Sequence, residues 1–423
     1  MSHREPIDLL LEARWLLPMT AGAPVLAQHA VAIRDGRIVA LGPAAALAER
    51  FAPREHLCRG QHVLLPGLIN AHTYSARVLR RIGGRAAQPL HADPAGQPSD
   101  HVRDGVRLAM AEMLCAGITC FADLSLQPEE VVRAVAAGPM RACVALPVAE
   151  TPTAWAENLT GHLARAERLW DAYRSDARIG LFFLPLGPAA LSEATLTRLR
   201  RVTDELDARI ALALYPAAED LVRDSPRVRG TLLAHLAELG LLRPGVAVCG
   251  SEALGPGDPE RIERAGAALV LSPRAALALG HPRLPAPLPA CTGLGCEDPA
   301  RTGALDVLEE ARTAAHLGLS ASEALRLATL GGATALGLQA QLGSLEPGKL
   351  ADLVCIGVSS LPARSYAQVP EALLFGATRA DVSDVWCTGR AAVSEGRLLA
   401  FDTEELTQLR ARWAGRLTLG AAA

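Results

Sequence analysis

The stretch that decides the fold is LLPGLINAHTY, residues 64–74, an apolar run that ends in His72, Thr73 and Tyr74. A strand that runs into His-x-His is a typical opening of a metal site, and here the second histidine position holds Tyr74. Imidazole binds zinc through a neutral nitrogen, whereas a phenol must first lose a proton with a pKa of about 10. The sequence therefore raises the question of whether a metal site is intact.

The composition excludes several classes of function. The chain has 423 residues, a formal charge of -3 and mixed acidic and basic residues, which gives no basic stripe for nucleic acid. No run of about 18 apolar residues could span a bilayer, and residues 1–6 lack the apolar core of a signal peptide. The nine cysteines fall singly, so we predict buried reduced thiols and a cytoplasmic location.

Short β-type runs lie at both ends of the chain. Residues 8–11, 29–33 and 38–41 are short β-type runs, and a turn at 34–37 between the second and third predicts a hairpin. Similar runs return at 351–356 and 382–386. We therefore expect one composite β-sandwich domain, with a C-terminal helix, from residues 1–66 and 348–423.

The middle of the chain alternates helix and strand. Apolar residues recur at helical spacing from residue 102 to 114, and Gly117 ends that helix before a strand. Continuous apolar runs fit parallel strands that are covered on both faces. Eight such runs, the number needed for a (β/α)8 barrel in residues 67–347, lie at 65–69, 118–122, 141–146, 179–184, 209–214, 246–249, 268–271 and 291–295.

Four motifs in order resemble the amidohydrolase superfamily, in particular its branch of methylthioadenosine/S-adenosylhomocysteine deaminases and triazine hydrolases. They are LPGLINAH (65–72), AEMLCAGIT (111–119), ATLGGATALG (328–337) and GSLEPGKLADLV (343–354). The resemblance implies a metal-bearing (β/α)8 barrel with a small β-sandwich from both termini, which agrees with the organisation above. It also implies a homodimer.

In such enzymes the metal is held at the C-terminal mouth of the barrel by four histidines and an aspartate, and a glutamate moves protons. Matched to those positions, this chain has His72, Tyr74, Ala213, Cys249 and Glu297, with Asp298 one register away as the alternative to Glu297. Pro216 stands at the position of the proton-transferring glutamate. The resemblance thus leaves His72 as the one ligand position that keeps the family residue.

Two hypotheses follow. In the first, the protein is a non-catalytic binding or regulatory relative that holds no metal and acts as a homodimer or in a complex with an active relative. In the second, His72, Cys249 and Glu297 form a rearranged site for one divalent ion (zinc, manganese or iron). That site would hydrolyse a C–N bond of a purine- or triazine-like aminated heterocycle.

Other residues have simpler interpretations. Tyr74 is expected to fill the space of an absent metal, and Asp123 to make a cap or loop contact at a strand end. His235 lies within a helical pattern and is read as structural. We interpret Gly331 and Gly332 as a joint between helix and loop.

Overall fold

The central feature of the structure is a ring of eight parallel strands. The structure is a computed structural model, and it describes residues 4–20, 22–82, 99–214, 231–358 and 368–419. Their order in the sheet follows the sequence, and a parallel bridge between Thr73 and Glu297 brings the first and last strand ends together. The strands are β5 (Leu68–Thr73), β6 (Ile118–Asp123), β7 (Arg141–Val148), β8 (Ile179–Pro185), β9 (Arg209–Ala213), β10 (Val246–Cys249), β11 (Ala268–Leu271) and β12 (Thr292–Leu294). The predicted (β/α)8 architecture is confirmed.

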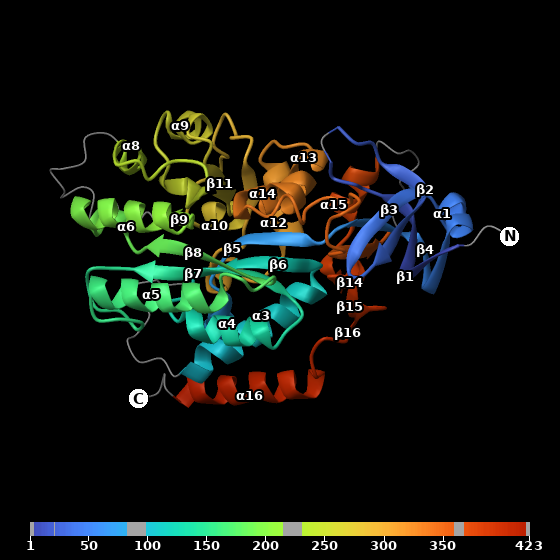
Figure 1. Ribbon diagram of the computed structural model, residues 1–423, viewed down its shortest axis with the longest axis horizontal. Coiled ribbons are helices and arrows are strands. Elements are labelled where there is room, and N and C mark those ends of the chain that lie inside the picture. The colour runs from blue at the N-terminus through green and yellow to red at the C-terminus, as the bar shows by residue number, and fades with distance from the viewer. Residues whose placement is uncertain (1–3, 21, 83–98, 215–230, 359–367, 420–423) are drawn as a thin grey trace.

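Helices cover the outer face of this ring (Figure 1). The first, α3, ends where expected, because Gly117 adopts a φ of 78° that favours glycine. Side chains cap later helices, as Asn158 does for α5 and Ser192 for α6. The covering helices include α3 (Ser99–Cys115), α4 (Pro128–Ala136), α5 (Leu159–Tyr173), α6 (Glu193–Glu205), α8 (Leu232–Glu238), α9 (Asp258–Arg264), α10 (Pro273–Ala278), α12 (Val307–His316) and α13 (Ala321–Arg326).

Both ends of the chain join in a second sheet, here named the terminal sheet, in the order β16-β15-β14-β13-β4-β1-β2-β3. The predicted hairpin is confirmed as the antiparallel pair β2–β3, but the short helix α1 (Ala44–Arg50) and the length of β4 were not predicted. This sheet lies at one end of the barrel (Figure 1). Its strands are β1 (Glu5–Leu16), β2 (Leu26–Arg34), β3 (Arg37–Pro43), β4 (Phe51–Pro66), β13 (Leu353–Gly357), β14 (Val382–Cys387), β15 (Arg390–Ser394) and β16 (Arg397–Leu398).

The chain passes from one sheet to the other at Gly67. The prediction that the barrel strand starts at Leu65 is wrong, because Leu64–Pro66 pair with β13 and the barrel strand begins at Leu68. A Cβ at position 67 would lie 2.2 Å from the Thr119 hydroxyl oxygen, so the crossing requires glycine. A single apolar run therefore serves two sheets.

The interpretation of Gly331 and Gly332 as a helix-to-loop joint is also wrong. Both lie inside one continuous helical stretch, where a π-helical turn (Leu327–Gly331) joins α13 to α14 (Gly332–Leu336). A Cβ on Gly331 would lie 2.2 Å from the carbonyl oxygen of Thr292, and one on Gly332 would lie 2.9 Å from Ile69. The glycines let this helix approach β12 and β5 closely.

The C-terminal helix α16 (Thr403–Leu419) lies against the barrel helix α3. The Trp413 indole donates a hydrogen bond of 3.0 Å to Asp104, which also pairs with Arg412.

The proposed domain boundaries at residues 66/67 and 347/348 stay predictions. None of the helices in the described ranges is both long and apolar enough to cross a bilayer.

All nine cysteines are free thiols, but the expectation that they are buried is wrong for Cys58 and Cys115. Both are exposed, one on the terminal sheet and one at the end of α3.

Candidate functional site

The structure places the five described candidate residues at the C-terminal ends of barrel strands. His72 is the penultimate residue of β5 and Tyr74 directly follows that strand, Ala213 ends β9, Cys249 ends β10, and Glu297 follows β12. All five side chains are buried. Pro216 lies outside the described residues. The matched positions therefore do gather at one mouth of the barrel, where sites of this fold occur.

Backbone contacts fix Glu297 beside β5. Its N–H donates to the His72 carbonyl at 2.9 Å, and its own carbonyl accepts from Tyr74 N–H at 3.2 Å and from the Thr73 hydroxyl at 3.0 Å. Glu297 has a φ of 53°, a left-handed conformation that is uncommon for a residue with a side chain. The clamp between the two strand ends holds it there.

Asp298, the alternative to Glu297, is already engaged elsewhere. Its carboxylate accepts a hydrogen bond of 2.7 Å from Arg77 in a buried ion pair. It also caps α11 (Pro299–Thr302) by accepting from Ala300 N–H at 2.8 Å. The geometry therefore favours Glu297 as the carboxylate at the mouth.

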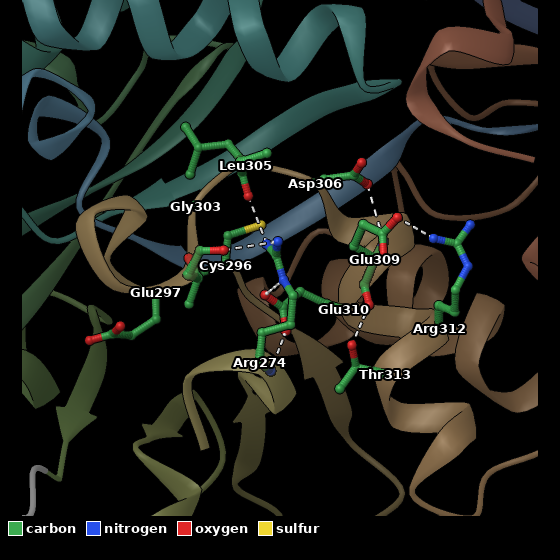
Figure 2. Close-up of polar contacts among 12 residues, drawn as sticks. Arg274, Cys296, Glu297, Gly303, Leu305, Asp306, Glu309, Glu310, Arg312 and Thr313 are labelled. Atoms are coloured by element: carbon green, nitrogen blue, oxygen red, sulfur yellow. Dashed lines mark hydrogen bonds and ion pairs between the residues drawn. The ribbon is translucent and has the colours of Figure 1, made fainter. Parts of the chain in front are cut away.

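A buried ion pair supports the segment that follows Glu297. Arg274 donates to Glu310 at 2.7 Å through its side chain and at 3.0 Å through its backbone N–H. Its other guanidinium nitrogens donate to the carbonyls of Thr302 at 3.1 Å and Ala304 at 2.7 Å. Figure 2 shows Glu297 pointing away from Arg274 and Glu310. This network anchors the loop whose first residue reaches the mouth.

Tyr74 fills the space between two neighbours. Its ring lies edge-on to the His72 ring at a centroid distance of 5.4 Å, and the Arg77 guanidinium lies 4.9 Å from its ring centroid. Burial raises the pKa of the Tyr74 phenol well above its usual value, and the Glu297 carboxylate raises it further. The phenol therefore stays protonated at neutral pH.

Burial controls the charge of the other three titratable groups. It lowers the pKa of His72 to about 4, so the imidazole is neutral at neutral pH. It raises the pKa of the Cys249 thiol to about 12, with Glu252 adding to the shift, so the thiol keeps its proton. Burial also raises the pKa of Glu297 to about 7.

These residues do not fit a metal ion in the arrangement described. Ligand atoms that share an ion lie close together, yet His72, Cys249 and Glu297, all described, do not form a group whose ligand atoms lie within 4.8 Å of one another. Within the described ranges one group of three histidine, cysteine or acidic side chains does so, and it lies on the terminal sheet: Glu12, His56 and Cys58. Ala213 offers no donor, and Tyr74 offers a phenol in place of an imidazole.

We expect the free energy of unfolding of chelator-treated protein to depend on pH, because the pKa of the Glu297 carboxyl is raised. Because its pKa is higher in the folded state, the unfolded chain ionises first as the pH rises from about 4.5 to about 7. Folded stability should fall over that window, with a penalty of up to about 3 kcal/mol above pH 7. Replacing Glu297 with Gln should raise the free energy of unfolding at pH 8 and change it much less at pH 4.5.

Urea denaturation of both proteins at the two pH values measures this effect. The same substitution at the exposed Glu49 is the control and should change little at either pH. Equal stability of the Glu297→Gln variant and the wild type at pH 8 would contradict the assigned protonation.

Small side chains leave a cavity of about 180 Å³ inside the barrel below Cys249. Barrels of this type usually fill their interior with Val, Ile and Leu. Here much of the wall is alanine, at positions 71, 122, 211 and 247. The alanine content was visible in the sequence, but its concentration on inward-facing positions was not predicted.

A second hollow, of about 450 Å³, lies beside the mouth and was missed by sequence reasoning. Its wall combines Glu252, which follows β10, with His281 and the proline-rich loop at 282–286. Burial raises the pKa of the Glu252 carboxyl. The signal that could have found Glu252 is its place in the short segment that follows the barrel strand β10.

Two further assignments concern structural residues. Asp123 accepts hydrogen bonds from the backbone N–H groups of Ser75 at 3.0 Å and Ser125 at 2.8 Å, so the predicted loop contact is confirmed. His235 lies on α8, with its Nε2 3.9 Å from Glu193 on α6.

Comparison with known protein families identifies the family of this chain. The model of the amidohydrolase family matches residues 63–392, which is more than half of the chain. This chain belongs to the amidohydrolase family. The predicted resemblance is therefore confirmed. A short match to an imidazolonepropionase-like composite domain of bacteria covers residues 30–52.

Relatives of this amidohydrolase with curated names include deaminases. A 5-methylthioadenosine/S-adenosylhomocysteine deaminase of Teredinibacter turnerae is 30% identical over 442 residues, which covers 99% of each chain. A protein of the same name from Saccharophagus degradans is 31% identical over 435 residues, with 98% of this chain and 97% of that protein covered. These names agree with the deaminase class of the second hypothesis more directly than with the first.

Solved structures similar to this amidohydrolase include an adenosine deaminase from Xanthomonas campestris with bound zinc. It has a TM-score of 0.90 and 33% identity and covers 98% of this chain and 99% of its own. Atrazine chlorohydrolase of Arthrobacter aurescens, complexed with zinc, has a TM-score of 0.81 at 20% identity, with 96% of this chain and all of that chain covered. At that identity the second likeness supports the fold alone.

Proposed function

We propose that this amidohydrolase binds an aminated heterocycle at the mouth of its barrel and does not hydrolyse it by metal-dependent chemistry. The observation that carries the proposal is the set of groups at the strand ends. One imidazole lies with a phenol, an alanine and a thiol, and the ligand atoms of His72, Cys249 and Glu297 do not all lie within 4.8 Å of one another. A zinc ion lowers the pKa of its bound water to about 7, and these groups do not supply the ligands for it.

The class of ligand follows from the carboxyl groups and from the relatives. Glu252 lines the hollow of about 450 Å³, and its protonated form is both a donor and an acceptor of hydrogen bonds. An aminated ring nitrogen heterocycle offers the complementary acceptor and donor on one edge. The deaminases similar to this chain act, by their names, on nucleosides with such an edge.

A second candidate is a deaminase with a rearranged site for a divalent ion at His72, Cys249 and Glu297. It is favoured by the similarity to named deaminases along nearly the whole chain. This candidate requires that the three side chains move closer to one another and that Cys249 loses its proton when the ion binds.

One pair of measurements separates the candidates. Calorimetry should detect saturable binding of adenosine, 5-methylthioadenosine or S-adenosylhomocysteine, while protein loaded with zinc, manganese or iron should release no ammonia from them. Glu252→Ala should weaken binding at least about tenfold, a loss of about 1.4 kcal/mol, whereas the remote Glu49→Ala should leave binding unchanged. Ammonia release that is abolished by Cys249→Ala would establish the second candidate, and absence of any binding would overturn the first.

Location and assembly stay proposals. A cytoplasmic location fits nine free thiols, and a homodimer, or a complex with an active relative, fits a non-hydrolytic role.

A further inference from the structure

The terminal sheet carries a cluster of three potential metal ligands far from the barrel mouth. Glu12 lies on β1, and His56 and Cys58 lie on the neighbouring strand β4. Their ligand atoms all lie within 4.8 Å of one another. Figure 1 shows β1 and β4 at the end of the molecule that carries the N terminus, well separated from β9.

Strand pairing fixes this geometry. In the parallel register of β1 and β4, Glu12 is opposite Cys58 and Leu10 is opposite His56. Residues two apart on a strand point to the same face, so Glu12, His56 and Cys58 all project from one face of the sheet. Leu10, on that same face, is fully buried and anchors the two strands. The three side chains are therefore presented by a rigid backbone rather than by a loop.

The distances between the donor atoms are close to those of a bound ion. The Cys58 sulfur lies 3.8 Å from His56 Nε2, and ligands of a tetrahedral zinc ion are about 3.4–3.7 Å apart, given bonds of about 2.0–2.3 Å. His56 Nε2 lies 2.5 Å from the Glu12 carboxylate, within hydrogen-bond distance. An ion bound between these two atoms would replace that hydrogen bond and widen the gap by about 1 Å.

The donor set selects the kind of ion. Thiolate and imidazole favour zinc and similar borderline or soft ions over magnesium and calcium, which take oxygen ligands. The cluster is partly exposed, with 41% of the His56 side chain and 26% of the Glu12 side chain accessible, so an ion can enter and a water can complete its coordination. A surface hydrogen bond between histidine and glutamate alone would not require the thiol beside it.

We propose that Glu12, His56 and Cys58 form a surface binding site for Zn²⁺ or a similar ion, separate from the barrel. Binding displaces the thiol proton of Cys58 to solvent, and a neutral His56 offers Nε2 to the ion with its own proton on Nδ1. The proposal is independent of whether the barrel holds a metal.

Thiol alkylation followed by mass spectrometry tests the site in the full-length protein. One equivalent of Zn²⁺ should slow alkylation of Cys58 at least about tenfold, because a metal-bound thiolate is a poor nucleophile. Cys115, the other exposed thiol, is the internal control and should react at an unchanged rate. Equal rates for Cys58 with and without zinc, or equal protection of both thiols, would overturn the proposal.

Cobalt substitution tests the ligands directly. The Co²⁺ complex should show a thiolate-to-metal charge-transfer absorption that Cys58→Ser abolishes and Cys115→Ser retains. His56→Ala should lower zinc affinity at least about tenfold, as expected when a ligand is removed. If Cys58→Ser bound as much metal as the wild type, the metal would lie elsewhere and the surface site would be refuted. That outcome would not affect the proposed binding of a heterocycle at the barrel mouth.

Discussion

Replacement of Glu310 with Ala is expected to lower the free energy of unfolding by about 3–5 kcal/mol, because removing one partner of a buried ion pair leaves the other charge uncompensated. The Glu310 side chain is fully buried, and only 18% of the Arg274 side chain is exposed. Arg274 also holds the carbonyls of Thr302 and Ala304, so a shift of its guanidinium would disturb the segment after Glu297.

Glu309 provides a matched control on the same helix. It pairs with Arg312, but 40% of its side chain is exposed, and exposed pairs contribute about 0–1 kcal/mol. Urea denaturation followed by circular dichroism should therefore give a small change for Glu309→Ala and a large one for Glu310→Ala. Similar losses for the two variants would contradict the role assigned to the Arg274–Glu310 pair.

A variant with four substitutions, Tyr74→His, Ala213→His, Cys249→His and Glu297→Asp, is expected to bind one zinc ion in the barrel at least about 100-fold more tightly than the wild type. Loss of an outer-shell partner alone costs about 10–100-fold in metal affinity, and this variant gains whole ligands. Replacement of Tyr74 also removes the ring that lies between His72 and Arg77.

Competition with a chromophoric chelator measures the zinc affinity. Both proteins should carry Cys58→Ser, so that an ion on the terminal sheet does not contribute. Ammonia release is not expected from the four substitutions alone, because Pro216 cannot transfer protons and a general base typically contributes about 10²–10⁴-fold. A wild-type barrel that binds zinc as tightly as the variant would refute the proposed loss of the metal site.

Much of the fold was predictable because its strands are parallel and covered on both faces. Runs such as residues 142–146 and 179–184 are almost entirely apolar. The run at 64–69 was divided wrongly because apolarity does not distinguish two buried sheets that share one chain segment. The break depends on the packing of Gly67 against Thr119, a contact between residues distant in sequence.

The site was predictable in position but not in detail. Motif order placed His72, Tyr74, Ala213, Cys249 and Glu297 at strand ends, and the structure brings those ends together. The protonation of Cys249 and Glu297 depends on burial in the folded barrel, which motif order does not reveal. The exposure of Cys58 was missed because a single cysteine in a β-type run is more often buried.

The alanine-lined space inside the barrel separates two kinds of evolutionary change. Larger side chains at positions such as Ala211 or Ala247 can occupy it and improve packing. The hollow beside Glu252 has walls of different residues, so such changes leave its lining intact. Mutations that change the stability of the barrel and mutations that change its ligand binding can thus accumulate at different sets of residues.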